Sequence, residues 1–228
     1  MSIHLGNTEI GQIYLGSTEI SEAYLGGVKV FDSGSTPPPT PYDAEIEYLK
    51  SDSSAYIDTG IGGDQDLTIE LKYRDSTYVA NGYVMGNVGA STSNMWRVIR
   101  SDRSQIAINT NNLVGNVKKF SVARNIDISV IMSKTSITVN GSTVTPTAPS
   151  ASTNNNNIVL FNSSLASPVS RDIGLMIYYC KIYLGSTLLR DFIPVRVGTT
   201  GYMYDNVSGQ LFGNVGTGSF VLGNDINT

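Results

Sequence analysis

The chain has 228 residues, of which 15% are charged, and a formal net charge of −4 at pH 7. This balance excludes disorder driven by high net charge and a basic nucleic-acid-binding face at the scale of the whole chain. The single cysteine, Cys180, and the single histidine, His4, exclude an internal disulfide framework, a CxxC zinc site and most catalytic triads, so we expect structure or binding without a cofactor or a catalytic residue.

Membrane insertion and secretion are also not expected from the sequence. No run of 18 apolar residues is present, which argues against a membrane span. Residues 1–5 lack a basic region followed by an apolar stretch, so we expect no secretory signal. The expected place is the cytoplasm or a particle released by lysis.

Residues 1–31 contain a repeat with a period of ten. Leucine and glycine hold the same two places in every copy, at Leu5-Gly6, Leu15-Gly16 and Leu25-Gly26, and the last place is always Ile or Val. Glycine adopts positive φ without steric cost, so apolar alternation around these glycines predicts very short strands joined by tight turns.

The repeat is too short to bury a core by itself, because chains below roughly 40 residues usually need help. Short repeats are stable when they stack on neighbours. We therefore expect either contacts with other subunits, as a trimer-forming or particle-docking stalk, or packing of the repeat onto the main domain of its own chain. The residues expected to bind the partner are Ile3, Leu5, Ile10, Ile13, Tyr14, Leu15, Ile20, Tyr24, Leu25 and Val30.

Residues 32–41 form a linker that begins with Gly and Ser and ends with four prolines in five residues. A proline run favours an extended polyproline II spacer, so this segment is expected to separate two bodies.

Residues 42–228 are patterned as β-strands throughout. The expected strands are short, rich in Val, Ile, Thr, Tyr and Phe, and bounded by Gly, Asn, Asp or Ser. They are Glu45–Leu49, Tyr56–Asp58, Leu67–Tyr73, Tyr83–Met85, Met95–Ile99, Gln105–Asn109, Lys119–Ala123, Ile126–Met132, Ser136–Val139, Ser142–Val144, Ile158–Phe161, Asp172–Tyr183, Leu188–Val195, Gly201–Asp205, Gln210–Phe212 and Phe220–Leu222. This spacing predicts an all-β, two-sheet antiparallel sandwich or jelly roll with minimal helix.

Two hairpins stand out in this region. Asn140-Gly141 between Ile137–Val139 and Ser142–Val144 suits a type I′ turn. The repeat phrase also returns at 182–189 between two clear strands, which supports the hairpin interpretation of residues 1–31.

Several segments resemble a known family. Glu47-Tyr48-Leu49 with Ala55–Gly60, and Thr138–Gly141 with Asn157–Phe161, resemble the concanavalin A-like (laminin G-like) jelly-roll domains of phage and bacterial surface proteins. The closing run is the most specific and is similar to the C-terminal ends of these domains in viruses of gut bacteria and their prophages; it comprises Leu189–Val195, Gly201–Asp205, Ser208-Gly209, Gly213-Asn214 and Gly216–Gly218. The ten-residue repeats resemble Tyr-Leu-Gly-Ser-Thr repeats of phage virion proteins.

The resemblance implies a phage virion structural protein, a head or tail fibre or decoration subunit, that displays a lectin-like domain and is anchored to other virion proteins by its repeats. Its alternative implication is a carbohydrate-binding adhesion module that recognises a host-surface glycan. Some relatives are glucanases with Glu-x-Asp-x-x-Glu on one strand. This sequence lacks that motif, and its acidic cluster Asp43–Glu47 has the wrong spacing, so a glycoside hydrolase is the least favoured reading.

Four kinds of residue remain as candidates for chemistry. Trp96, in Met95–Ile99, is either a sandwich residue or a sugar-stacking platform. Asp64 and Asp66 suit a plain turn better than a calcium site, which needs six to eight oxygen ligands. Cys180 lies among apolar residues and is expected to be buried, and His4 has no sequence partner.

Overall fold

The computed structural model describes residues 3–5, 8–10, 13–15, 18–20, 22–25, 28–32, 40–52, 54–63, 66–77, 81–89, 95–112, 117–146, 154–163 and 174–226. The turn glycines of the repeat, Asp64 and residues 33–39 of the expected linker lie outside this set. The chain divides into two compact units, Met1–Thr40 and Pro41–Thr228, each of which is described by itself.

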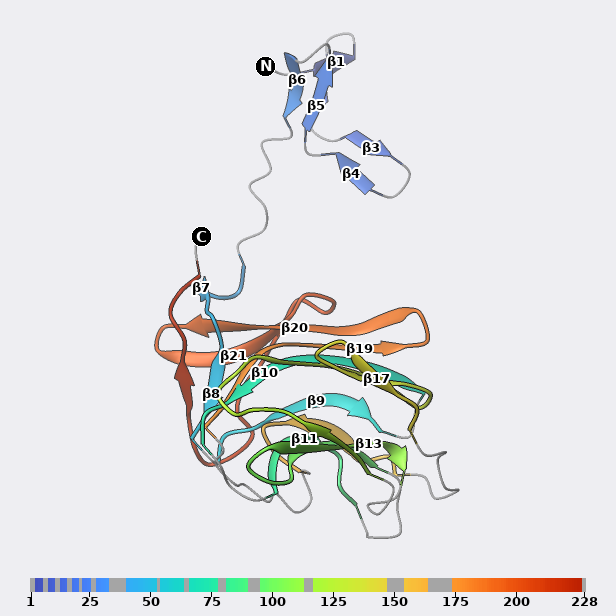
Figure 1. The fold of residues 1–228 in the computed structure, drawn as a ribbon. Helices are drawn as coiled ribbons and strands as arrows, with labels where there is room; N and C mark the ends of the chain where they lie inside the picture. The colour runs from blue at the N-terminus through green and yellow to red at the C-terminus, as the bar shows by residue number, and fades with distance from the viewer. Residues whose placement is uncertain are drawn as a thin grey trace. The chain divides into compact units, whose positions relative to one another are not determined.

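The first unit consists of three β-hairpins, as the repeat predicted. Each hairpin is a separate two-stranded antiparallel sheet, coloured blue in Figure 1. The pairs are β1 (Ile3–Leu5) with β2 (Thr8–Ile10), β3 (Ile13–Leu15) with β4 (Thr18–Ile20), and β5 (Glu22–Leu25) with β6 (Val28–Asp32).

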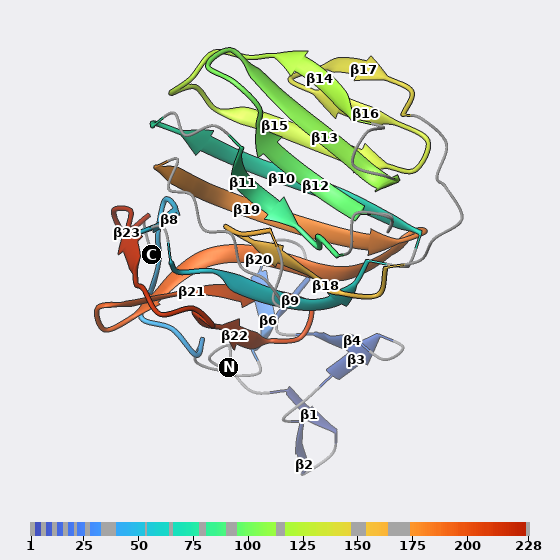
Figure 2. The same cartoon turned by 90° about the horizontal axis from the view of Figure 1, so that it is seen from below.

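The second unit is a sandwich of two antiparallel sheets, which confirms the predicted fold class (Figures 1 and 2). The described residues contain no helix, and therefore none that is long and apolar enough to cross a membrane. The larger sheet has eleven strands: β7 (Ala44–Glu45), β8 (Leu49–Ser51), β10 (Leu67–Asp75), β15 (Ile128–Ser133), β16 (Ile137–Val139), β17 (Ser142–Val144), β19 (Leu175–Leu184), β20 (Thr187–Val197), β21 (Thr200–Asp205), β22 (Gln210–Phe212) and β23 (Phe220–Leu222). The smaller sheet has six: β9 (Ile57–Gly62), β11 (Gly82–Gly86), β12 (Met95–Arg100), β13 (Gln105–Asn112), β14 (Lys118–Ser121) and β18 (Asn157–Leu160).

The core lies between the two sheets and follows from the alternation of the sequence. Along β10, Leu67, Ile69, Leu71 and Tyr73 are buried, while Thr68, Glu70, Lys72 and Arg74 are half-buried on the opposite face. Successive side chains of a strand point to opposite faces, so this pattern places one face of β10 in the core and leaves the other for contact with solvent or a ligand.

A buried ion pair joins the two sheets inside this core. Arg100 of β12 binds Asp75 of β10, and both side chains are fully buried. The guanidinium also donates to the carbonyl oxygens of Val122, at 3.1 Å, and Ala123, at 3.5 Å. Arg100 therefore fixes the segment after β14 as well as the distance between the sheets.

The two predicted hairpins of the sandwich are confirmed. In the β16–β17 hairpin, Asn140 (φ 46°) and Gly141 (φ 84°) both have positive φ, as a type I′ turn requires. In the β19–β20 hairpin, the register pairs Leu184 with Thr187 around Gly185.

The glycine-rich motif of Gly213-Asn214 and Gly216–Gly218 attaches the C-terminal segment to the sandwich; we call it the closing clasp. Asn214 accepts hydrogen bonds from the backbone of Tyr56 (3.0 Å) and Gly216 (2.7 Å) and donates to the carbonyl of Gly218 (2.6 Å). A Cβ at Gly216 would collide with the carbonyl oxygen of Ser54. Within the closing run, Asn214 and Gly216 therefore hold the C-terminal segment against Ser54 and Tyr56.

Candidate functional site

The residues predicted to bind a partner all lie in strands of the three hairpins. The register is the same in the first two: Ile3 lies opposite Ile10 and Leu5 opposite Thr8, just as Ile13 lies opposite Ile20 and Leu15 opposite Thr18. The third hairpin departs from it, with a register shift between Ala23 and Tyr24. Contact of these residues with a partner stays a prediction.

Trp96 does not serve as a sugar-stacking platform. Its side chain is fully buried, and its Nε1 donates to the carbonyl oxygen of Gly63 at 2.9 Å. The reason is that every residue of β12 is buried, so this strand has no face on which an exposed ring would lie. The glycan-binding hypothesis for Trp96 is therefore wrong, and the packing alternative is correct.

The other candidates from the sequence do not assemble a site in the described part of the chain. The Asp66 carboxylate is exposed and lies 3.7 Å from Lys134 Nζ. No group of three or more His, Cys, Asp or Glu residues in the described ranges is arranged to hold a metal ion. Cys180 is buried, and this burial raises the pKa of its thiol. His4 lies in β1 opposite Glu9.

A pocket of about 490 Å³ lies on the outer face of the larger sheet, where β8, β10 and β19 run side by side. We call it the tyrosine pocket. It gathers residues from five parts of the chain, including the last described residue, Ile226, which is 43% exposed. Its lining consists of Glu47, Tyr48, Arg74, Asp127, Met176, Tyr178 and Ile226.

Two tyrosine rings form a corner in this pocket. The rings of Tyr48 and Tyr178 lie 6.1 Å apart between centroids at an interplanar angle of 84°. Tyr178 is the extra residue of a β-bulge, because Lys72 pairs with Tyr179 while Tyr73 pairs with Ile177. A bulge redirects a side chain, which explains why Tyr178 turns toward Tyr48, the residue before the start of β8.

The charged groups of the pocket hold Tyr178 in place. Asp127 accepts hydrogen bonds from Arg74 Nε (2.8 Å) and Nη2 (2.6 Å), and Lys72 Nζ lies 3.2 Å from its other oxygen. Lys72 Nζ also lies 5.3 Å from the centroid of the Tyr178 ring, a cation–π geometry. Partial burial raises the pKa of Asp127, but the hydrogen bonds from Arg74 and Lys72 outweigh it, so the pKa is lowered and the carboxylate stays ionised.

Glu47 supplies the second carboxylate of the pocket. Its Oε2 accepts hydrogen bonds from the backbone nitrogen and the Nδ2 of Asn224, at 3.3 and 3.1 Å. This contact ties the C-terminal segment to the wall of the pocket. Tyr48, the next residue along the chain, also lines the pocket.

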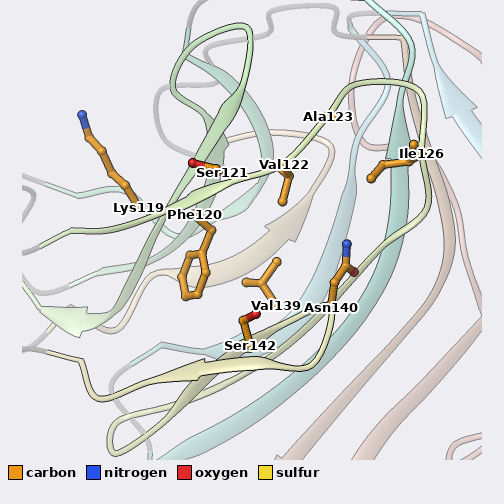
Figure 3. Close-up of a pocket in the computed structure, with 9 residues that line it drawn as sticks. All are labelled: Lys119, Phe120, Ser121, Val122, Ala123, Ile126, Val139, Asn140 and Ser142. Atoms are coloured by element: carbon orange, nitrogen blue, oxygen red, sulfur yellow. The ribbon is translucent and has the colours of Figure 1, made fainter.

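A second hollow, of about 420 Å³, lies at the open edge of the sandwich between β14 and the β16–β17 hairpin (Figure 3). Phe120, Val122 and Val139 point into it and are nearly buried, whereas Lys119 points away from it. This edge groove has an apolar floor but lacks paired aromatic rings and carboxylates. The tyrosine pocket is therefore the better candidate for recognition of a polar ligand.

The sequence did not identify the tyrosine pocket. Alternation along β10 predicts that Lys72 and Arg74 lie on the outer face, and that signal was present. The approach of Tyr48 to Tyr178 depends on the pairing of Leu49 with Ile177, residues far apart in the chain. No local pattern reveals that pairing.

Comparisons with known proteins do not assign this chain a function. No protein-family model and no curated protein matches the chain. Among solved structures, the chain is similar to the Ruminococcus gnavus IT-sialidase CBM40 bound to α2,3-sialyllactose, with a TM-score of 0.45 and 13% identity over 63% of this chain and 91% of that chain. It is also similar to that CBM40 bound to α2,6-sialyllactose, with a TM-score of 0.40 and 13% identity over 63% of this chain and 92% of that chain. Likeness at this level carries no argument about a ligand.

Proposed function

We propose that the sandwich is a carbohydrate-binding module and that the tyrosine pocket is its sugar site. The observation that carries this proposal is the corner of Tyr48 and Tyr178 beside the carboxylates of Glu47 and Asp127 and the guanidinium of Arg74. A sugar ring has C–H groups on its faces, which can stack on the tyrosine rings, and hydroxyls around its edge, which can form hydrogen bonds with the charged groups.

In this proposal, the tyrosine rings stack on the sugar ring and the charged groups form hydrogen bonds with its hydroxyls. A tyrosine face offers an apolar surface with a hydroxyl at its edge, which suits the C–H face of a pyranose. Carboxylates accept hydrogen bonds from sugar hydroxyls, and such charge-assisted bonds are stronger than neutral ones. The pocket volume of about 490 Å³ falls in the range of small-molecule sites.

The proposed role is binding without hydrolysis. A glycosidase needs a carboxylic acid whose raised pKa lets it donate a proton to the leaving group. Asp127 has a lowered pKa because Arg74 and Lys72 hydrogen-bond to it, so it is a poor proton donor.

The test is a screen of the full chain on a broad glycan array, followed by calorimetric titration of each hit. Tyr178→Ala should weaken a hit by about 5- to 150-fold, since a stacked aromatic ring contributes roughly 1–3 kcal/mol. Tyr183→Ala is the matched control, because Tyr183 lies half-buried on the same strand but does not line the pocket. Silence on the array, equal losses in both variants, or hydrolysis of a bound glycan would overturn the proposal.

A second role is favoured by the three hairpins, which form a unit of their own. An isolated two-stranded hairpin is marginally stable in water, so repeated hairpins call for partners. Together with the resemblance to phage virion repeats, this supports an anchor that joins the chain to other virion proteins or to copies of itself, as a trimer. The virion then becomes the proposed location, and the sandwich the displayed domain.

The anchor is tested by mass measurement in solution. The full chain should form an oligomer or join particles, and a chain that lacks residues 1–40 should be a monomer that does neither. The shortened chain retains the whole core of the sandwich, which is built from residues 46–203. A monomeric full chain that does not join particles, or unchanged assembly of the shortened chain, would contradict the anchor.

A further inference from the structure

Arg74, which lines the tyrosine pocket, and Lys72, which lies beside it, are both already paired with a carboxylate of the protein. Arg74 donates two hydrogen bonds to Asp127 Oδ1, and Lys72 Nζ lies 3.2 Å from Asp127 Oδ2. The protein's own carboxylate therefore occupies the position between the two cations that the acid group of an anionic ligand would take.

The remaining charge of the pocket is also unfavourable to an anion. Glu47 has no cationic partner among the described residues, since its hydrogen bonds come from the neutral Asn224. Among the residues that line the pocket, Glu47 and Asp127 are acidic and Arg74 is the one cation, so their charges sum to −1; Lys72 lies beside Asp127 but does not line the pocket. Lys50, a further cation on β8, lies opposite Met176 in the register but does not line the pocket.

From this arrangement we propose that the tyrosine pocket selects neutral sugars and rejects acidic ones. The inference rests on the proposed carbohydrate-binding function and specifies its ligand class. An acidic sugar would bring a third carboxylate next to Asp127 and Glu47, and like charges held close together in a partly desolvated site repel each other. A neutral hexopyranose meets no such barrier, and its hydroxyls donate to Glu47 and Asp127.

The role of Asp127 as an internal anion makes a sharp prediction. Asp127→Asn keeps the size and one acceptor oxygen but leaves Lys72 and Arg74 without their carboxylate. The two cations are then free for an anionic ligand. The variant should lose affinity for neutral sugars by roughly tenfold, the worth of a charged hydrogen bond, and should gain affinity for acidic ones.

The experiment titrates the full chain with matched pairs in which a carboxylate replaces the C6 hydroxymethyl group: glucose with glucuronate, and galactose with galacturonate, as free sugars and as short oligomers. Wild type should bind at least one neutral member more tightly than its acidic counterpart, and Asp127→Asn should reverse that order. Asp66→Asn removes an exposed carboxylate that pairs with Lys134 elsewhere, so it should leave the order unchanged.

Three results distinguish failure of the neutral-sugar preference from failure of the carbohydrate-binding function. Preference of wild type for the acidic members would overturn the neutral-sugar inference while the carbohydrate-binding function stands. An unchanged order in a folded Asp127→Asn variant would overturn it as well. If that variant does not fold, Glu47→Gln takes its place and should shift the preference in the same direction. No binding of any glycan by wild type, on the array or in these titrations, would overturn the function itself.

Discussion

The buried Arg100–Asp75 pair predicts a large and specific effect on stability. Both side chains are fully buried, and Asp75 is the only carboxylate that Arg100 binds in the described residues. Asp75→Ala would leave the guanidinium buried with only the carbonyls of Val122 and Ala123 as acceptors. Breaking a buried pair in this way costs about 3–5 kcal/mol, a large part of the roughly 5–15 kcal/mol that stabilises a typical domain.

For a domain of this size each kcal/mol lowers the melting temperature by about 2–4 °C, so the expected drop is roughly 6–20 °C. Differential scanning calorimetry measures it. The matched control is Asp225→Ala, which breaks the Arg196–Asp225 pair whose side chains are 29% and 51% exposed, and which should cost about 0–1 kcal/mol. The double variant Asp75→Leu with Arg100→Met removes both charges and should be more stable than Asp75→Ala.

A loss of stability in Asp75→Ala no larger than that in Asp225→Ala would refute the role of the buried pair. A double variant less stable than Asp75→Ala would also refute it, because the loss would then come from packing and not from the unpaired charge.

Three further predictions follow from the closing clasp and the core. Gly216→Ala should destabilise the sandwich by about 1–3 kcal/mol in chemical denaturation, since its Cβ would meet the Ser54 carbonyl; an unchanged midpoint would contradict the clasp. Cys180 should react with a thiol reagent only after unfolding, because it is buried and its thiol pKa is raised; rapid labelling of the native chain would show otherwise. Partial burial raises the pKa of Asp52, but hydrogen bonds from the backbone of Ser219 and neighbouring residues outweigh it and lower the pKa. The stabilisation by Asp52 is therefore present above about pH 4 and is lost as the pH falls through the lowered folded-state pKa. In unfolding curves measured over a pH series, Asp52→Asn should reduce the loss of stability in acid. An unchanged dependence of stability on pH would contradict this role of Asp52.

Much of the fold could be predicted because it depends on patterns of residues that are close together in the sequence. The ten-residue period gave the three hairpins, and Asn140-Gly141 gave the type I′ turn. Short segments rich in Val, Ile, Thr, Tyr and Phe, bounded by Gly, Asn, Asp or Ser, predicted most strands of the sandwich. These features depend on neighbours within a few residues, which is the range that a single sequence reveals.

The errors come from pairing between distant segments. Residues 45–49 were expected to form one strand, but the structure divides them between β7, which pairs with β20, and β8, which pairs with β19 and β23. Trp96 was a candidate for sugar stacking because an aromatic ring suits the apolar face of a pyranose, yet every residue of β12 is buried. Tyr48 and Tyr178 are brought together by the β8–β19 pairing, so the candidate site could not be predicted from the sequence.

A crystal structure of the full chain with a neutral oligosaccharide bound tests the central claim most directly. The account predicts a sugar ring seated in the corner of Tyr48 and Tyr178, with hydroxyls on Glu47 and Asp127. A sugar found instead in the edge groove at Phe120 and Val139, or an empty tyrosine pocket beside a sugar bound elsewhere, would contradict it.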